Sequence, residues 1–151
     1  MKLAEALILR ADSMKRIQQL RERLVRSAQT PEGERPPEDP QALLTEVSQM
    51  LSQYADIVSR INRTNTATPF QEGKSLTDAL AQRDTLSLER GLLESLMAAA
   101  TNQSHRYQRA EIKYVSTVSV ADIQKRMDDL ARRYRELDSA IQLLNWQIDL
   151  I

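Results

Sequence analysis

A seam of apolar residues near the C-terminus constrains the fold more than any other feature of the sequence. Its members are separated by alternating steps of four and three (Ile123, Met127, Leu130, Tyr134, Leu137, Ile141, Leu144, Ile148 and Ile151). Such a heptad pattern lays one straight face of a helix against a neighbouring helix. The sequence therefore predicts a mainly α-helical protein whose long helices pack side by side at shallow angles.

Three further segments carry helical signals, so we expect four long helices in an antiparallel or coiled-coil-like bundle. The predicted ranges are residues 2–28, 40–63, 77–100 and 120–149. Asp39 and Pro40 have the residue types of an N-cap and a first helical position, and Thr77 is a possible cap for the third helix. The second helix has a heptad seam of its own (Leu44, Val47, Leu51, Tyr54, Val58 and Ile61). The third is apolar over so broad a face that we expect it to contact more than one neighbour.

Between the third and fourth helices the pattern changes from helical to extended. Residues 112–118 include a β-branched run, which predicts a short extended β arm over about residues 109–118. A lone strand leaves its backbone groups unpaired, so the arm needs a partner. That partner is either the loop at residues 66–76 or the same arm of another subunit. With 151 residues, we expect one helical domain spanning residues 1–151.

Composition excludes several classes of protein. Lysine plus arginine equals aspartate plus glutamate at 21 each, so the chain has no overall charge that would attract nucleic acid or an anionic membrane. Without cysteine there are no disulfides or thiolate metal sites. No uncharged run approaches the roughly 20 residues needed to span a bilayer, and the N-terminus lacks signal-peptide features. We expect a cytoplasmic protein with no nucleic-acid partner.

The residues that common reactions require are missing. A di-metal carboxylate bundle needs Glu-x-x-His pairs on two helices, whereas the chain has one histidine, His105, with no glutamate three positions before it. There is no Gly-x-Gly-x-x-Gly, Walker loop or Gly-x-Ser-x-Gly elbow. The sequence therefore predicts a protein that is not an enzyme and holds no metal or cofactor.

One polar cluster outside the heptad faces is a candidate ligand site. Its members come from the end of the second helix, the third helix and the arm (Asn62, Arg63, Asn65, Arg83, Asp84, Arg109 and Lys113). Arginine outnumbers lysine sixteen to five, and its planar fork favours fixed pairing with carboxylates. In the structural interpretation, Arg83 and Asp84 pair with arm residues and the asparagines cap backbone groups. In the functional interpretation, the cluster binds a small anion or nucleic acid.

The first and last turns of the chain are apolar over more surface than one seam uses. The residues concerned lie on both terminal helices (Leu3, Leu7, Ile8, Leu143, Trp146 and Leu150). If the helices alternate in direction, the two ends meet and form one apolar surface. Such a surface usually marks an interface, so we expect self-association. The alternative is that these residues close the core of the monomer.

Five segments spread over the whole chain are distinctive in order and spacing: residues 1–12, 61–65, 78–84, 134–138 and 145–146. Together they resemble an uncharacterised bacterial family whose members often carry the label septicolysin, after a proposed pore-forming toxin. The resemblance implies a small helical cytoplasmic homo-oligomer, a hexamer, without established catalytic residues. The label also implies an alternative, a membrane-active protein. Because Glu5, Asp12 and Glu22 interrupt the basic face of the first helix, self-assembly is the leading hypothesis.

Overall fold

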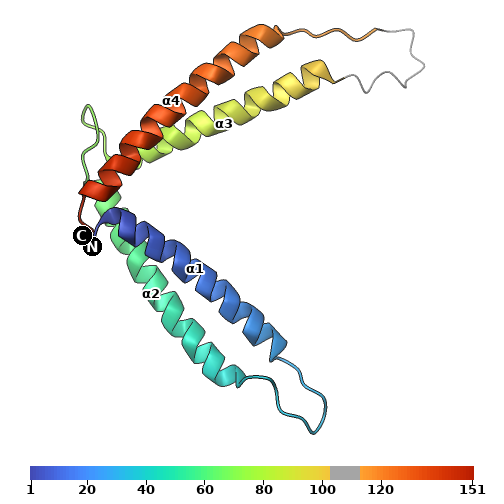
Figure 1. Cartoon of the computed structure of the whole chain (residues 1–151), viewed down its shortest axis with the longest axis vertical. Coiled ribbons are helices and arrows are strands. Elements are labelled where there is room, and N and C mark those ends of the chain that lie inside the picture. Colours follow the sequence, from blue (N-terminus) through green and yellow to red (C-terminus); the bar gives the residue numbers. More distant parts are fainter. Residues whose placement is uncertain (103–112) are drawn as a thin grey trace. The chain divides into compact units, whose positions relative to one another are not determined.

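The computed structural model describes residues 1–102 and 113–151, and its regular structure consists of helices (Figure 1). These are α1 (Leu3–Arg26), α2 (Pro40–Ala67), α3 (Leu76–Thr101) and α4 (Val120–Gln147). The prediction of a mainly α fold with four long helices is confirmed. The largest shift in a predicted boundary is at the end of α2, which continues to Ala67 rather than residue 63.

Capping residues set the starts of α2 and α3. The Asp39 side chain accepts a hydrogen bond from the Gln41 backbone N–H at 3.0 Å, as its position before a proline predicts. The cap of α3 is Ser75 and not Thr77. The Ser75 hydroxyl accepts from the Asp78 N–H at 3.3 Å, and the Asp78 carboxylate accepts from the Ser75 N–H at 2.8 Å. This reciprocal capping box satisfies two otherwise unpaired donors, so the helix begins at Leu76.

The chain divides into two compact units, and the expectation of one domain over residues 1–151 stays a prediction. Unit 1 comprises Met1–Pro69 with Leu143–Ile151, and unit 2 comprises Phe70–Gln142. Unit 1 contains α1 and α2, which run side by side in opposite directions (Figure 1). Unit 2 contains α3 and most of α4, which also run antiparallel. Each unit is therefore built on an antiparallel helix pair.

The core of unit 1 uses part of the predicted seam of α2, in which Ile61 is buried and Val47, Tyr54 and Val58 are half-buried. Leu44 and Leu51 of the predicted seam are 44% and 47% exposed. Leu43 and Ile57, which the predicted seam did not include, are buried instead. Apolar residues recur every seven positions from both Leu43 and Leu44, so two overlapping seams exist in the sequence. Packing against α1 selects the first.

The start of α1 and the end of α4 meet in unit 1, as alternating helix directions require. Lys2 and Asp149 form an isolated antiparallel β-bridge, and the Leu3 N–H donates to the Ile148 carbonyl at 2.9 Å. The Lys2 ammonium lies 3.0 Å from an Asp149 carboxylate oxygen. The two chain ends are thus joined by backbone and side-chain bonds.

Thr64 ties the last residue to α2. Its side chain is fully buried, and its hydroxyl donates to the Arg60 carbonyl at 2.8 Å. The same oxygen accepts from the Ile151 N–H at 3.0 Å, while Arg60 Nε donates to the Ile151 carbonyl at 3.1 Å. A buried hydroxyl that both donates and accepts meets the usual requirement for satisfied polar groups.

The core of unit 2 confirms the C-terminal seam. Four seam residues within this unit are buried (Ile123, Met127, Leu130 and Ile141). They pack in a unit whose α3 contributes Leu76, Ala79 and Leu86 to the buried set. Ile151, the last seam position, is 59% exposed and belongs to unit 1. The seam therefore marks a core face along most of its length.

A tight turn precedes α3, in the segment predicted as a loop or small hairpin. The Phe70 N–H donates to the Lys74 carbonyl at 2.8 Å, and the Lys74 N–H donates back to the Gln71 carbonyl at 2.8 Å. Glu72 and Gly73 have φ values of 48° and 75°. These left-handed conformations close the turn, and glycine adopts one of them without steric cost.

The predicted β arm is not seen in the described residues. Residues 113–118 form no strand, and the remainder of the predicted arm, residues 109–112, lies outside the described ranges. At residues 116–118 the Ser116 hydroxyl instead donates to the Val118 carbonyl at 2.8 Å. A strand requires a paired edge, and no other described segment forms a ladder with these residues. A run of β-branched residues is therefore not sufficient to form a strand when no partner segment is present among the described residues.

Across the described ranges, no helix has the length and apolar character needed to cross a membrane.

Candidate functional site

The residues of the predicted polar cluster are distributed over both units. Asn62 and Arg63 are exposed and Asn65 is half-buried, near the end of α2 in unit 1. Arg83 and Asp84 belong to α3 in unit 2, where they form an ion pair. Lys113 is exposed, and Arg109 lies outside the described residues. Of the predicted set, the structure thus brings Arg83 and Asp84 together.

Arg83 has a second partner that sequence reasoning missed. Its Nη1 lies 3.1 Å from an Asp138 carboxylate oxygen on α4, and its Nη2 lies 3.1 Å from Asp84. Partial burial lowers the pKa of the Arg83 guanidinium, and hydrogen bonds to the two carboxylates raise it, with a net rise. Arg83 therefore joins α3 to α4 as a fixed cation. The structural interpretation expected Arg83 and Asp84 to pair with arm residues, whereas among the described residues Arg83 pairs with Asp84 and Asp138.

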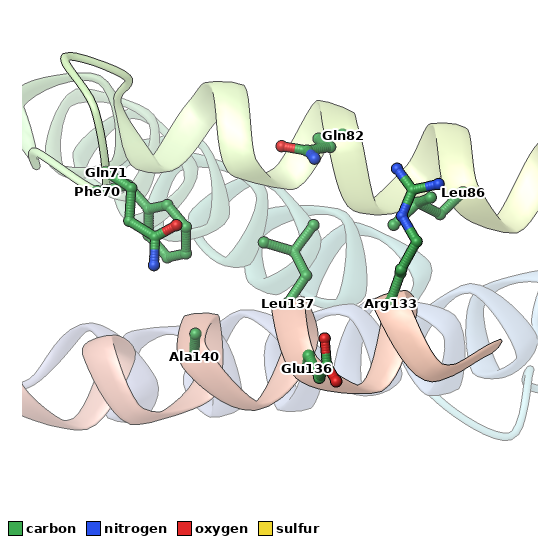
Figure 2. Close-up of a pocket in the computed structure, with 8 residues that line it drawn as sticks. All are labelled: Phe70, Gln71, Gln82, Leu86, Arg133, Glu136, Leu137 and Ala140. Carbon is green, nitrogen blue, oxygen red and sulfur yellow. The ribbon is translucent and has the colours of Figure 1, made fainter. Parts of the chain in front are cut away.

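A groove on unit 2 is a candidate ligand site that the sequence did not indicate (Figure 2). Its volume is about 340 Å³. Its walls come from the turn before α3, from α3 and from α4 (Phe70, Gln71, Gln82, Leu86, Arg133, Glu136, Leu137 and Ala140). These side chains come from segments up to seventy positions apart, so no local motif marks the groove.

Charge in the groove comes from Arg133 and Glu136, one helical turn apart on α4. In Figure 2 the Arg133 side chain extends from α4 toward α3, beside Leu86. Within the described part of the chain, Arg133 has no ion pair or hydrogen bond. Glu136 accepts one long contact, 3.4 Å, from Arg132. Both groups therefore retain capacity to bind a ligand.

Ion pairs on the same two helices keep the groove walls in place. At about 100° per residue, Gln82 and Arg83 project to opposite sides of the Leu86 direction. The Arg83–Asp138 pair therefore lies on one flank of the helix seam and the groove on the other. Further along α3 in the direction of its C-terminus, Glu89 forms an ion pair with Arg126 of α4. These two ion pairs connect α3 to α4 beside the groove.

The predicted interface residues at the chain ends differ in exposure. Ile8, Leu143 and Trp146 are 55%, 62% and 55% exposed. Leu7 and Leu150 are half-buried. Leu3 is fully buried in unit 1 and is a core residue, which corrects its assignment to a surface. We call Ile8, Leu143 and Trp146 the terminal surface.

The outer face of α3 exposes a second set of apolar residues. Leu88 and Leu92 are each 71% exposed and line a shallow depression of about 690 Å³ together with small residues (Ser87, Gly91 and Ser95) and Asp84. At about 100° per residue, Leu88 points roughly 160° away from the core residue Leu86. We call Leu88, Gly91, Leu92 and Ser95 the α3 outer face. The sequence indicated that the apolar surface of this helix is broad, but it did not indicate that these residues lie opposite the core.

Residues 1–102 and 113–151 contain no group of three or more acidic or histidine side chains that could hold a metal ion. Each of the two units is built on an antiparallel helix pair, and each exposes apolar residues to solvent.

The chain belongs to the family described as "Family of unknown function (DUF6847)", whose model matches residues 10–150. It is also similar, at 44% sequence identity and a TM-score of 0.92, to a crystal structure of a functionally unknown conserved protein from Corynebacterium diphtheriae. That similarity covers 100% of this chain and 99% of the other. No curated protein matches the chain. Membership of a bacterial family of unknown function is confirmed, and neither description carries the name septicolysin.

Proposed function

We propose that this protein is a cytoplasmic self-assembling helical protein, with no catalytic reaction of its own, whose copies join through apolar faces. The observation that carries the proposal is the 71% exposure of Leu88 and Leu92 on the α3 outer face. Fully burying a leucine side chain contributes about 1.5–3 kcal/mol. Two adjacent leucines left in water therefore provide a substantial driving force for association.

The α3 outer face suits a second copy of the same helix. Nothing lies within 4 Å of the position that a Cβ would take at Gly91, so a partner helix could approach the backbone closely there. In a two-fold contact the same patch of both copies meets, so that residue i of one copy contacts residue j of the other and the reverse. The residues from Leu88 through Leu92 to Ser95 that face outward carry no charge, and the nearby Arg90 and Glu94 pair with each other at 3.1 Å. Asp84, which lines the same depression, is paired with Arg83, so its charge is partly compensated in a contact between two copies.

The terminal surface provides a second contact in the proposal. Ile8, Leu143 and Trp146 are exposed on unit 1, where the hydrogen bond between Leu3 and Ile148 holds the two chain ends together. Tryptophan is enriched among the interface residues that contribute most of the binding energy. Because each unit carries one face, more than two copies could join. The six copies implied by the resemblance to septicolysin-labelled proteins are one such assembly.

Light scattering coupled to size exclusion tests the proposal. We expect the wild-type protein to elute as a multimer at micromolar concentration. Changing both Leu88 and Leu92 to glutamine should lower the mass, because the α3 outer face becomes polar. Val25→Gln is the matched control, since Val25 is 66% exposed on α1 and belongs to neither face. A wild-type protein that is monomeric at every concentration would contradict the proposal.

The membrane-active alternative is tested with the same samples. Dye-filled vesicles containing anionic lipid should remain intact when the multimer is added, because apolar faces that are covered by other copies cannot insert. Release of dye by a wild-type monomer would instead favour the pore-forming function that the septicolysin label suggests.

The anion or nucleic-acid alternative relies on Arg83. Because the Arg83 guanidinium is already paired with Asp84 and Asp138, binding of a further anion there is disfavoured.

A further inference from the structure

We propose that the unit 2 groove binds a small zwitterion, a molecule that carries one carboxylate and one ammonium group on an apolar body. A free amino acid with an apolar side chain is the representative of this class. The proposal uses residues outside both apolar faces, so it does not depend on self-assembly.

Arg133 supplies the carboxylate end of the site. Its guanidinium presents a planar fork that matches a carboxylate through two parallel hydrogen bonds. Arg83, Arg126 and Arg132 of the same unit already pair with acidic side chains. Arg133 has no such partner in the described residues and is directed across the groove toward α3 (Figure 2). Among the residues that line the groove, it is the cation that is placed to receive an incoming anion.

Because Glu136 adds a negative charge to the groove, we expect the ligand to be a zwitterion rather than a simple anion. Glu136 lines the groove one turn after Arg133 and would repel a second negative charge. Its contact with Arg132 is long, at 3.4 Å, and both side chains are more than half exposed. Exposed pairs of this kind contribute little, and a carboxylate accepts several hydrogen bonds. An ammonium group held near Glu136 would be stabilised by the same charge that excludes phosphate.

The remaining walls fit the body of such a molecule. Leu86, Leu137 and Ala140 are apolar, and the Phe70 ring lies near one end. The amides of Gln71 and Gln82 can donate to the carboxylate or accept from the ammonium group. A volume of about 340 Å³ lies at the lower end of the range for small-molecule pockets. The site therefore suits a metabolite of amino-acid size.

Binding of three leucine derivatives to the full chain tests the proposal. Leucine carries both charges, N-acetyl-leucine only the carboxylate, and leucinamide only the ammonium group. Amide and side-chain NMR shifts should move at Gln82, Arg133 and Glu136 on titration with leucine, and the derivatives should bind at least about tenfold more weakly, a factor that corresponds to one lost charge-assisted interaction.

Two arginine variants separate a specific site from a general surface effect. Arg133→Gln should abolish the shifts, whereas Arg135→Gln, an exposed neighbour on α4 that does not line the groove, should leave them unchanged. Circular dichroism of both variants checks that the helices are intact. Leucine binding that survives Arg133→Gln, equal binding of all three probes, or no shift at the groove residues at millimolar leucine would each overturn the proposal.

Discussion

Replacing Asp138 with asparagine should destabilise the protein more than the same change at Asp84. Both carboxylates bind Arg83 at 3.1 Å, but the Asp138 side chain is 31% exposed and the Asp84 side chain 68%. Exposed ion pairs contribute about 0.2–1 kcal/mol, whereas loss of one partner from a buried pair costs about 3–5. Because Asp84 remains as a second partner, we expect about 1–2 kcal/mol for Asp138→Asn and under about 1 for Asp84→Asn.

Urea unfolding followed by far-ultraviolet circular dichroism measures these free energies. Double-mutant cycles with Arg83→Gln isolate each pair, and the Arg83–Asp138 coupling should exceed the Arg83–Asp84 coupling. Added salt should weaken the Asp84 coupling more strongly, because solvent ions screen the more exposed charge. An Asp84→Asn cost equal to or greater than that of Asp138→Asn would show that Arg83 does not join the two helices as described.

Three further substitutions test local features. Ser75→Ala should cost about 1 kcal/mol of unfolding free energy in a urea titration, because it removes the cap of α3. Leu20→Ala, at a fully buried position of α1, should cost about 2–5 kcal/mol, and a cost below 1 would contradict its burial. The hydrogen bond and charge of Lys2 hold the pKa of Asp149 below its ordinary value. Its contribution to stability is therefore present above about pH 4 and lost as the pH falls through the lower pKa of the folded protein, so Asp149→Asn should flatten the acid side of a stability–pH curve.

Local sequence signals predicted the helices well because each signal acts within a few residues. The alternating seam from Ile123 to Ile148 marks a core face, and the Asp39 cap marks a start. The meeting of the two chain ends also followed from alternating helix directions. The choice of Leu43 over Leu44 did not, because both positions start acceptable heptad seams. Such a choice depends on the neighbouring helix, which is not a local property.

The candidate sites were less predictable because their residues are distant in sequence. Asp138 pairs with a residue 55 positions earlier, and the groove joins Phe70 to Ala140. No spacing rule connects such positions in a single sequence. The α3 outer face was partly visible, since leucines on every side of a helix indicate a second neighbour. The structure was needed to show that the core lies on the Leu86 side of the helix and that Leu88 and Leu92 remain exposed to solvent.

Copies of this chain should associate through the α3 outer face. Sedimentation equilibrium of the wild-type protein over a hundredfold range of concentration tests it most directly, beside a variant in which Leu88 and Leu92 are both glutamine. The wild-type mass should be a multiple of the chain mass and should fall on dilution, because association follows mass action. The variant should form smaller species at the same concentrations while keeping its helical circular dichroism. A wild-type mass equal to one chain throughout, or equal masses for both proteins, would contradict the claim.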